Sequence, residues 1–351
     1  MVGAMNEQME EVTLYGFGAD RLKLLLMPAV CVLSFGLPGT IGSAVRDLCR
    51  AAPLAFYILC GFFVLDEDDD ERHGKLLRAI RSTGIFFLVL TLFYLGLNAL
   101  VFTLQGADWL GDVPTNRVLF NFVVLCVWPF QTGECLWFIQ SLFYAWVLLW
   151  LLDWKGHLPF LVLPLFILTT VLMLLSGEFA GLIKLNLLGY SYIPANAVTR
   201  ALPYLLLGAL LRRHSDRLFL INPLLWGGLL ILGVVLALAE IMLLSYTGKL
   251  VYVGHMIGYG LIAFSLCCIA LAHPEEELGT VFRHASCLSR FIYAFHQPVG
   301  LFLPLLLALF GERLASLVLN FGGVAVFIFT LLPALLAGAI EYGFRRIVDI
   351  L

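Results

Sequence analysis

The chain has 351 residues, of which 61% are hydrophobic and 13% charged, and its formal net charge at pH 7 is −3. Soluble globular proteins carry about 25% charged residues, roughly twice this fraction. The composition therefore excludes an ordinary soluble domain, and the small negative charge argues against a nucleic-acid partner. Repeated apolar runs of about 18 residues or more predict an all-α, polytopic membrane helix bundle that folds as one domain in the lipid bilayer.

The first 20 residues are polar and acidic, and they lack the short apolar core and small-residue cleavage site of a signal peptide. We therefore expect 1–20 to be a cytoplasmic tail and 21–346 to be the membrane domain.

Ten apolar spans follow along the chain, and together they predict about ten transmembrane helices. They are 22–38, 50–65, 83–104, 136–152, 158–176, 198–211, 220–245, 250–272, 290–310 and 314–343. The apolar stretch 118–130 is short, and we interpret it as re-entrant or interfacial. The tryptophans near it, Trp109, Trp128 and Trp137, fit an interfacial belt.

The distribution of Lys and Arg predicts the orientation. With a cytoplasmic N-terminus, 14 of the 21 basic residues lie on the inside and 7 on the outside. The inside set is Arg21, Lys23, Arg72, Lys75, Arg78, Arg81, Lys155, Arg212, Arg213, Arg217, Arg283, Arg290, Arg345 and Arg346, and the outside set is Arg46, Arg50, Arg117, Lys184, Arg200, Lys249 and Arg313. The positive-inside rule therefore predicts that both termini are cytoplasmic, in a multi-pass protein of the cytoplasmic (inner) membrane.

The eight cysteines form no Cys-x-x-Cys pair, and the seven histidines show no His-x-x-x-His spacing. The sequence thus predicts neither a disulfide framework nor a metal site.

The segment Ser289–Pro298, SRFIYAFHQP, carries three polar side chains into the ninth apolar span. Ser289, Tyr293 and His296 are four and three residues apart, so they share one face of a helix. Because polar groups are unfavourable in hydrocarbon, this stripe should face protein or a water-filled cavity. The residues alone allow two interpretations, a helix end whose polar groups bond to neighbours or part of a functional site.

The same Ser-x-x-x-Tyr-x-x-His-x-Pro run resembles a segment of the type-3 membrane acyltransferase family (acyltransferase 3), which are integral membrane O-acyltransferases. Further segments resemble the family in the same order along the chain, namely the first span with Lys23, the run Cys60-Gly61-Phe62, and the run Leu136-Trp137-Phe138. Two positions depart from the family pattern. Ser34 stands where the family has a histidine implicated in acyl transfer, and Cys60 stands where it has a serine.

The resemblance implies transfer of an acyl group, often acetyl in this family, from a cytoplasmic acyl-CoA-type donor to a hydroxyl of an envelope glycan or a lipid-linked acceptor. No bound cofactor is expected, and acetyl-CoA would be a substrate. The resemblance implies that His296, Tyr293 and Ser34 belong to the catalytic site, and that Lys23, Cys60, Gly61 and Trp137 belong to the donor site. The residues alone also allow Lys23 to be a snorkelling anchor and Gly61 to be a helix-packing position.

The segment Asp66–Ser82 is the most charged part of the chain, and it ends with three cations spaced three residues apart, Lys75, Arg78 and Arg81. These cations either contact lipid head groups from a solvated cytoplasmic loop or hold the phosphates of the acyl-CoA donor. The family has basic residues at the equivalent place.

Glu240 and His255 lie eight residues before and seven residues after Gly248, where the seventh and eighth spans join. At about 1.5 Å per residue, antiparallel helices would bring them to nearly the same depth. We therefore expect either separate contacts with water and head groups, or an outer polar site that takes the place of the histidine missing at Ser34.

Two other functions stay open. A transporter or flippase of the envelope pathway would use the same bundle as a path and would show inverted repeats and broken helices. A catalytically inactive relative, acting as a partner of another protein, is motivated by Ser34.

Overall fold

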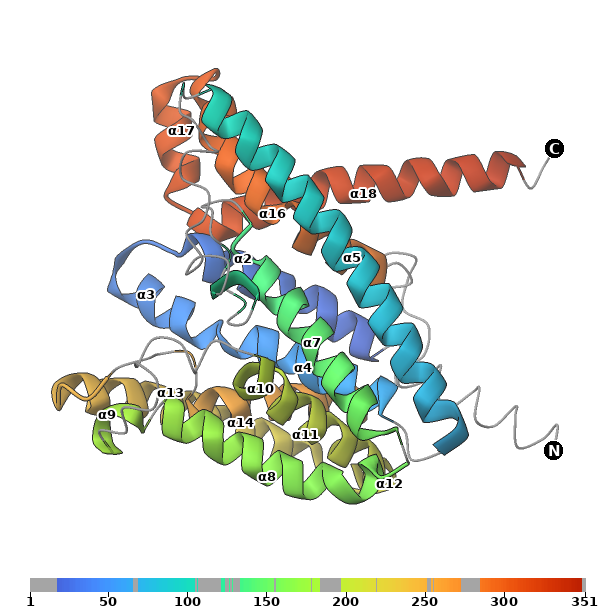
Figure 1. Ribbon diagram of the computed structural model, residues 1–351. Helices are drawn as coiled ribbons and strands as arrows, with labels where there is room; N and C mark the ends of the chain where they lie inside the picture. Colours follow the sequence, from blue (N-terminus) through green and yellow to red (C-terminus); the bar gives the residue numbers. More distant parts are fainter. Residues whose placement is uncertain are drawn as a thin grey trace. The chain divides into compact units, whose positions relative to one another are not determined.

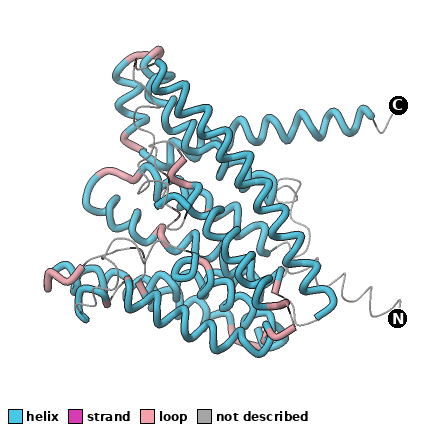
Figure 2. The backbone as a smooth tube through the Cα atoms, in the orientation of Figure 1, coloured by secondary structure: helices cyan, strands magenta, loops and turns pink. Residues whose placement is uncertain are grey.

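The computed structural model describes residues 18–65, 69–104, 106, 121–123, 126, 128, 133–154, 156–177, 179–183, 197–218, 220–250, 254, 256–272 and 285–348. Within these residues every regular element is a helix and there is no strand, as Figures 1 and 2 show. The prediction of an all-α chain is therefore confirmed.

A helical segment over 18–25 precedes the first labelled helix. The helices are α2 (Met27–Phe35), α3 (Gly39–Leu48), α4 (Ala51–Val64), α5 (Asp69–Leu104), α7 (Leu136–Leu152), α8 (Leu158–Ser176), α9 (Ala180–Ile183), α10 (Ala197–Arg200), α11 (Leu202–Arg213), α12 (Ser215–Leu218), α13 (Pro223–Tyr246), α14 (Ile257–Ala272), α16 (Ala285–Ala308), α17 (Glu312–Leu319) and α18 (Gly322–Val348).

Five helical stretches among the described residues are long and apolar enough to cross a membrane, namely Gly39–Val64, Glu71–Leu104, Leu158–Ser176, Pro223–Tyr246 and Cys287–Ala308. Three shorter helices are also apolar, namely Leu136–Leu152, Ile257–Ala272 and Gly322–Leu336. Large apolar side chains are exposed along several of these helices, for example Leu88 and Leu92 of α5 at 57% and 61%. Such surfaces fit a lipid environment, because a soluble monomer rarely exposes extended apolar faces. The chain is thus a helical membrane protein.

The structure differs from the expected spans in three places. The charged segment 69–82 is not a loop, because it forms the first turns of α5, a single helix of 36 residues. At 1.5 Å per residue α5 is about 54 Å long, so it extends beyond a hydrocarbon core of about 30 Å. The stretch before α4 forms the helix α3, and the last span is divided at Asn320 and Phe321 into α17 and α18.

The described residues form two compact units, and α4 and α14 each contain a boundary between them. The first, here called the terminal unit, comprises 18–52 and 266–348. In it α2 packs against α16 and α18, and α17 lies between α16 and α18 in the chain and contacts both. Leu303 and Leu307 of α16 pack with Ala325 and Val326 of α18 to form a buried apolar cluster.

The second, the central unit, comprises the described residues of 53–265. Here α5 packs against α7, α8 packs against α11, and the short helix α10 contacts α7, α8 and α11. Helices α4 and α11 approach backbone to backbone, because a Cβ at Gly61 would overlap the Leu205 carbonyl and one at Gly208 would overlap the Ile58 carbonyl. Glycine at both positions therefore permits a contact that any side chain would prevent.

Candidate functional site

The terminal unit brings together two residues that are 262 positions apart, Ser34 near the end of α2 and His296 at the midpoint of α16. The Oγ atom of Ser34 lies 3.2 Å from Nε2 of His296. His296 is 0% exposed, whereas Ser34 is partly exposed. The imidazole is therefore buried behind the serine hydroxyl.

The hydrogen bonds of His296 define which nitrogen carries the proton. Nδ1 lies 2.8 Å from the carbonyl oxygen of Tyr293 and 3.2 Å from that of Ile292, both in the preceding turn of α16. A carbonyl oxygen only accepts, so Nδ1 is the donor. In the neutral ring Nε2 then carries a lone pair, and this pair is directed at the Ser34 hydroxyl. The arrangement is that of a hydroxyl beside an oriented base.

Phe35 and Gly300 hold the two helices at this distance. The Phe35 ring meets the His296 ring edge to face, with centroids 6.3 Å apart. One turn further along α16, a Cβ at Gly300 would overlap the Phe35 ring. The absence of a side chain at Gly300 thus gives Phe35 its place over α16.

The end of α2 is stabilised by two neighbouring helices. Gly36 closes α2 with φ = 69°, a value that favours glycine, and its carbonyl accepts a hydrogen bond of 2.8 Å from the N–H of Gly323 in the first turn of α18. Nε of Arg46 in α3 donates to the Leu33 carbonyl at 3.0 Å. The partly positive N-terminal end of α18 therefore lies against the turn that carries Ser34.

The other members of the predicted polar stripe follow the same helix. Ser289 is 4% exposed, Tyr293 is partly buried, and the Tyr293 ring lies 6.1 Å from the His296 ring. The structure therefore places His296 and Ser289 in the protein interior, as the spacing predicted. The side chain of Tyr293 lies beside His296, and the backbone carbonyl of Tyr293 orients the imidazole ring.

In the central unit the three predicted phosphate ligands lie on the first turns of α5. Arg78 and Arg81 are exposed, and Nζ of Lys75 pairs with Glu71 at 3.2 Å. Further basic residues lie at the same end of this unit, where the Arg212 guanidinium is stacked 5.4 Å from the centre of the Phe62 ring. Arg213 and Arg72 line one cavity of about 20 Å³, which has room for about one water molecule.

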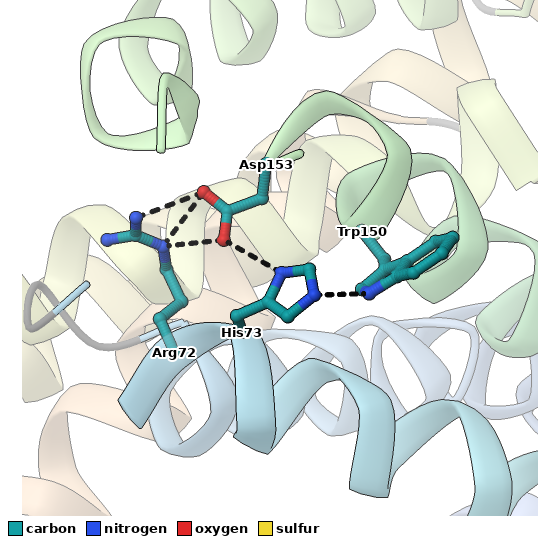
Figure 3. Close-up of polar contacts among 4 residues, drawn as sticks. All are labelled: Arg72, His73, Trp150 and Asp153. Atoms are coloured by element: carbon teal, nitrogen blue, oxygen red, sulfur yellow. Dashed lines mark hydrogen bonds and ion pairs between the residues drawn. The ribbon is translucent and has the colours of Figure 1, made fainter. Parts of the chain in front are cut away.

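Arg72 is also part of a polar cluster that was not expected from the sequence, in which a buried ion pair adjoins the exposed side chain of His73 (Figure 3). Its Nε and Nη2 atoms lie 3.0 to 3.2 Å from the carboxylate oxygens of Asp153, and both side chains are only 2% exposed. Trp150 donates its indole N–H to Nε2 of His73 at 3.0 Å, and Nδ1 of His73 lies 4.0 Å from Asp153. In the sequence, the one feature that indicates this cluster is Asp153, an acidic residue at the end of the apolar span 136–152.

Three residues expected at the donor site have structural contacts. The backbone of α11 packs directly against Gly61, so Gly61 is a helix-packing position. The Arg200 guanidinium lies 4.4 Å from the centre of the Trp137 ring. Nζ of Lys23 pairs with Asp20 one turn earlier at 2.8 Å. Cys60, beside Gly61 in α4, is partly exposed. Lys23 belongs to the terminal unit and the others to the central unit.

Glu240 is a buried carboxylate in α13, 9% exposed, and its Oε2 accepts a hydrogen bond of 3.1 Å from the N–H of Gly258 in the first turn of α14. A carboxylate at a helix N-terminus is favourable, so this contact stabilises the α13–α14 pair. The predicted partner, His255, lies outside the described residues, and the pairing of Glu240 with His255 stays a prediction.

No protein-family model, curated protein or solved structure matches the chain. Among the described residues no group of three or more His, Cys, Asp or Glu side chains could hold a metal ion. The chemistry on which a function can be proposed is therefore that of the Ser34–His296 pair and of the basic end of the central unit.

Proposed function

We propose that the protein is an integral membrane acyltransferase that moves an acyl group, acetyl in the simplest case, from a CoA-type thioester to a hydroxyl of an envelope glycan or lipid-linked acceptor. The observation that carries the proposal is the 3.2 Å contact between Ser34 Oγ and His296 Nε2, with the ring oriented by the Tyr293 carbonyl. Acyl transfer to a hydroxyl requires a base that removes the hydroxyl proton, and a neutral, oriented imidazole is suited to this task.

The donor requires a second set of residues. A CoA-type thioester carries several phosphate charges, and arginine and lysine are the residues that bind phosphate. Exposed Arg78 and Arg81, with Lys75 on the same helix, would contact these phosphates. The assignment agrees with the predicted cytoplasmic side of the first turns of α5 and with ten spans in the inner membrane.

One observation favours transport as a second candidate. The last apolar span is broken at Asn320 and Phe321, and the N-terminal end of α18 bonds through Gly323 to the carbonyl of Gly36, which closes α2. Discontinuous helices whose ends line the substrate site are typical of transporters. A transporter, however, has no need for a hydroxyl aligned with an imidazole.

The test uses the purified full chain in lipid nanodiscs with acetyl-CoA labelled in its acetyl group and isolated envelope glycan as the acceptor. We expect label in the glycan and release of free CoA thiol. His296→Ala should lower the rate by about 10²- to 10⁴-fold, the usual contribution of a general base. The matched control is Phe295→Ala, because Phe295 is the preceding residue and is 36% exposed.

The outcomes separate the candidates. Equal rates in His296→Ala and the unmodified protein would contradict the proposed role of the imidazole. Uptake of glycan precursors into proteoliposomes, together with no release of CoA thiol, would favour the transporter. Neither activity would favour an inactive relative that acts through a partner.

A further inference from the structure

We infer that Ser34 is a catalytic nucleophile, and that the acyl group is carried on its Oγ as an ester between donor and acceptor. The identity of the donor rests on the proposed function. At this position the resembled family has a histidine, so the role of Ser34 follows from the contacts in this chain and not from the resemblance.

The base is buried, and a single polar atom of its ring remains for chemistry. His296 is 0% exposed, and its Nδ1 is occupied by the carbonyls of Tyr293 and Ile292. The remaining polar atom, Nε2, is covered by Ser34 Oγ at 3.2 Å. An acceptor hydroxyl therefore cannot approach Nε2 without displacing the serine, whereas the serine hydroxyl is already in place and is partly exposed. The group that this base is positioned to activate is Ser34.

The serine proton has two competing acceptors. Ser34 Oγ lies 3.2 Å from the Val30 carbonyl and 3.2 Å from His296 Nε2. Both atoms are acceptors, and a hydroxyl has one proton to share between them. Thr330 and Ser265, by contrast, donate to the carbonyl four residues earlier at 2.7 Å, the ordinary bond of a hydroxyl in a helix. The corresponding bond of Ser43 is 3.3 Å long, so what distinguishes Ser34 is its second acceptor, which is a base.

Two helix ends of opposite dipole sign meet beside Ser34, the C-terminal end of α2 and the N-terminal end of α18. When a hydroxyl attacks a thioester, negative charge develops on the carbonyl oxygen. The turn of α2 that carries Ser34 lies against the N-terminal end of α18, through the bond from Gly323 N–H to the Gly36 carbonyl. The positive end of a helix dipole favours negative charge nearby. The N-terminal end of α18 thus offsets the negative end of α2, and the activation of Ser34 rests on its contact with His296.

The reaction balances in two steps. In the first, Ser34 Oγ attacks the thioester carbonyl, Nε2 of His296 takes the hydroxyl proton, the C–S bond breaks, and the proton passes to the leaving thiolate, which departs as CoA thiol. In the second, Oγ is esterified and no longer donates to Nε2, so the acceptor hydroxyl takes that place: it attacks the Ser34 ester, Nε2 takes its proton, the C–Oγ bond breaks, and the proton returns to Ser34. No oxidant, metal or further reactant is consumed.

The experiment uses a fluorophosphonate probe, which forms a covalent bond with activated serine hydroxyls and is independent of acetyl-CoA. The full chain in nanodiscs is incubated with the probe, digested and mapped by mass spectrometry. We expect one labelled serine, Ser34, no labelling in Ser34→Ala, and a labelling rate in His296→Ala that is lower by about 10²-fold or more. Ser43→Ala is the matched control, because the Ser43 hydroxyl lies in α3 and donates to the Gly39 carbonyl of its own helix.

A second measurement detects the intermediate. With labelled acetyl-CoA and no acceptor, acetyl-Ser34 should accumulate and should disappear when glycan is added. Ser34→Cys should instead retain an acetyl thioester that neutral hydroxylamine removes. A melting temperature of Ser34→Ala within a few degrees of the unmodified protein checks that the variant is folded.

The inference is overturned if Ser34 of the folded protein is not labelled, or if Ser34→Ala retains acetyl transfer. The proposed function fails separately. Labelling of Ser34 without any reaction with acetyl-CoA would support the nucleophile and refute the thioester donor, whereas acetyl transfer by Ser34→Ala would support the function and refute the nucleophile.

Discussion

Arg72, in the first turns of α5, and Asp153, directly after α7, form a buried ion pair in which Nη2 and Oδ1 are 3.0 Å apart. Because α5 and α7 pack against each other, the pair joins the beginning of one helix to the end of the next. The pair places the start of α5 and the end of α7 at one end of the central unit.

Removal of one partner should be strongly destabilising. In Arg72→Ala the Asp153 carboxylate stays buried without this cation, and such a loss usually costs about 3 to 5 kcal/mol. The measurement is the free energy of unfolding in mixed micelles. Lys75→Ala is the matched control, because its partner Glu71 is 64% exposed and pairs of this kind contribute about 0 to 1 kcal/mol. Equal effects of the two variants would contradict the structural role of Arg72.

Replacement of glycine by alanine should change the stability in opposite directions at Gly61, which lies in the contact between α4 and α11, and at Gly96, which has open space around it. Gly61→Ala would place a Cβ on the Leu205 carbonyl, so the helices must separate, at about 1 to 3 kcal/mol. Gly96→Ala in α5 meets nothing within 4 Å and should stabilise the helix by about 0.4 to 1 kcal/mol. Thermal unfolding in detergent checks the sign of each change, and a neutral Gly61→Ala would show that α4 and α11 do not touch.

Donor binding should depend on the exposed cations of α5. The double variant Arg78→Ala, Arg81→Ala is expected to bind CoA at least about tenfold more weakly by calorimetry, with little change in stability, because exposed charges contribute little to folding. Arg313→Ala in α17, also exposed, serves as the control. Unchanged affinity in the double variant would remove these residues from the donor site and favour their interaction with lipid head groups.

Packing of Phe35 over Gly300 should keep Ser34 and His296 in contact and so sustain the reactivity of Ser34. Gly300→Ala forces the Phe35 ring to move, and we expect it to slow fluorophosphonate labelling of Ser34. The combination of Gly300→Ala with Phe35→Ala removes the overlap and should restore part of the rate. If the single and the double variant are equally slow, the effect does not pass through Phe35.

The predicted orientation can be tested by thiol labelling from the two sides of the membrane. Native Cys287, exposed at the start of α16, should react from the cytoplasmic side. A cysteine in place of Tyr246, which is 92% exposed at the end of α13, should react from the outside. Labelling of both from the same side would refute the ten-span arrangement.

The amino-acid sequence by itself determined the class of this protein. The patterns used were local: they are the apolar runs and the spacing of Ser289, Tyr293 and His296. Over a few turns of helix, the 3.6-residue period relates sequence to structure directly. Local patterns therefore predicted the helices and the buried histidine. They did not predict that the charged segment before residue 83 continues α5, because its acidic beginning is equally typical of a solvated loop.

The tertiary structure alone decided which polar groups meet. Ser34 and His296 are 262 residues apart, and Arg72 and Asp153 are 81 apart. Such contacts depend on which helices pack together, and this depends on small features such as Gly300 beneath Phe35 or Gly61 beneath Leu205. In a membrane the driving force for helix packing is close contact and the pairing of polar groups, and hydrophobicity does not distinguish one neighbour from another. Apolar spans therefore carry little information about their partners, and the pairing of the serine with the histidine emerged only when the helices were packed.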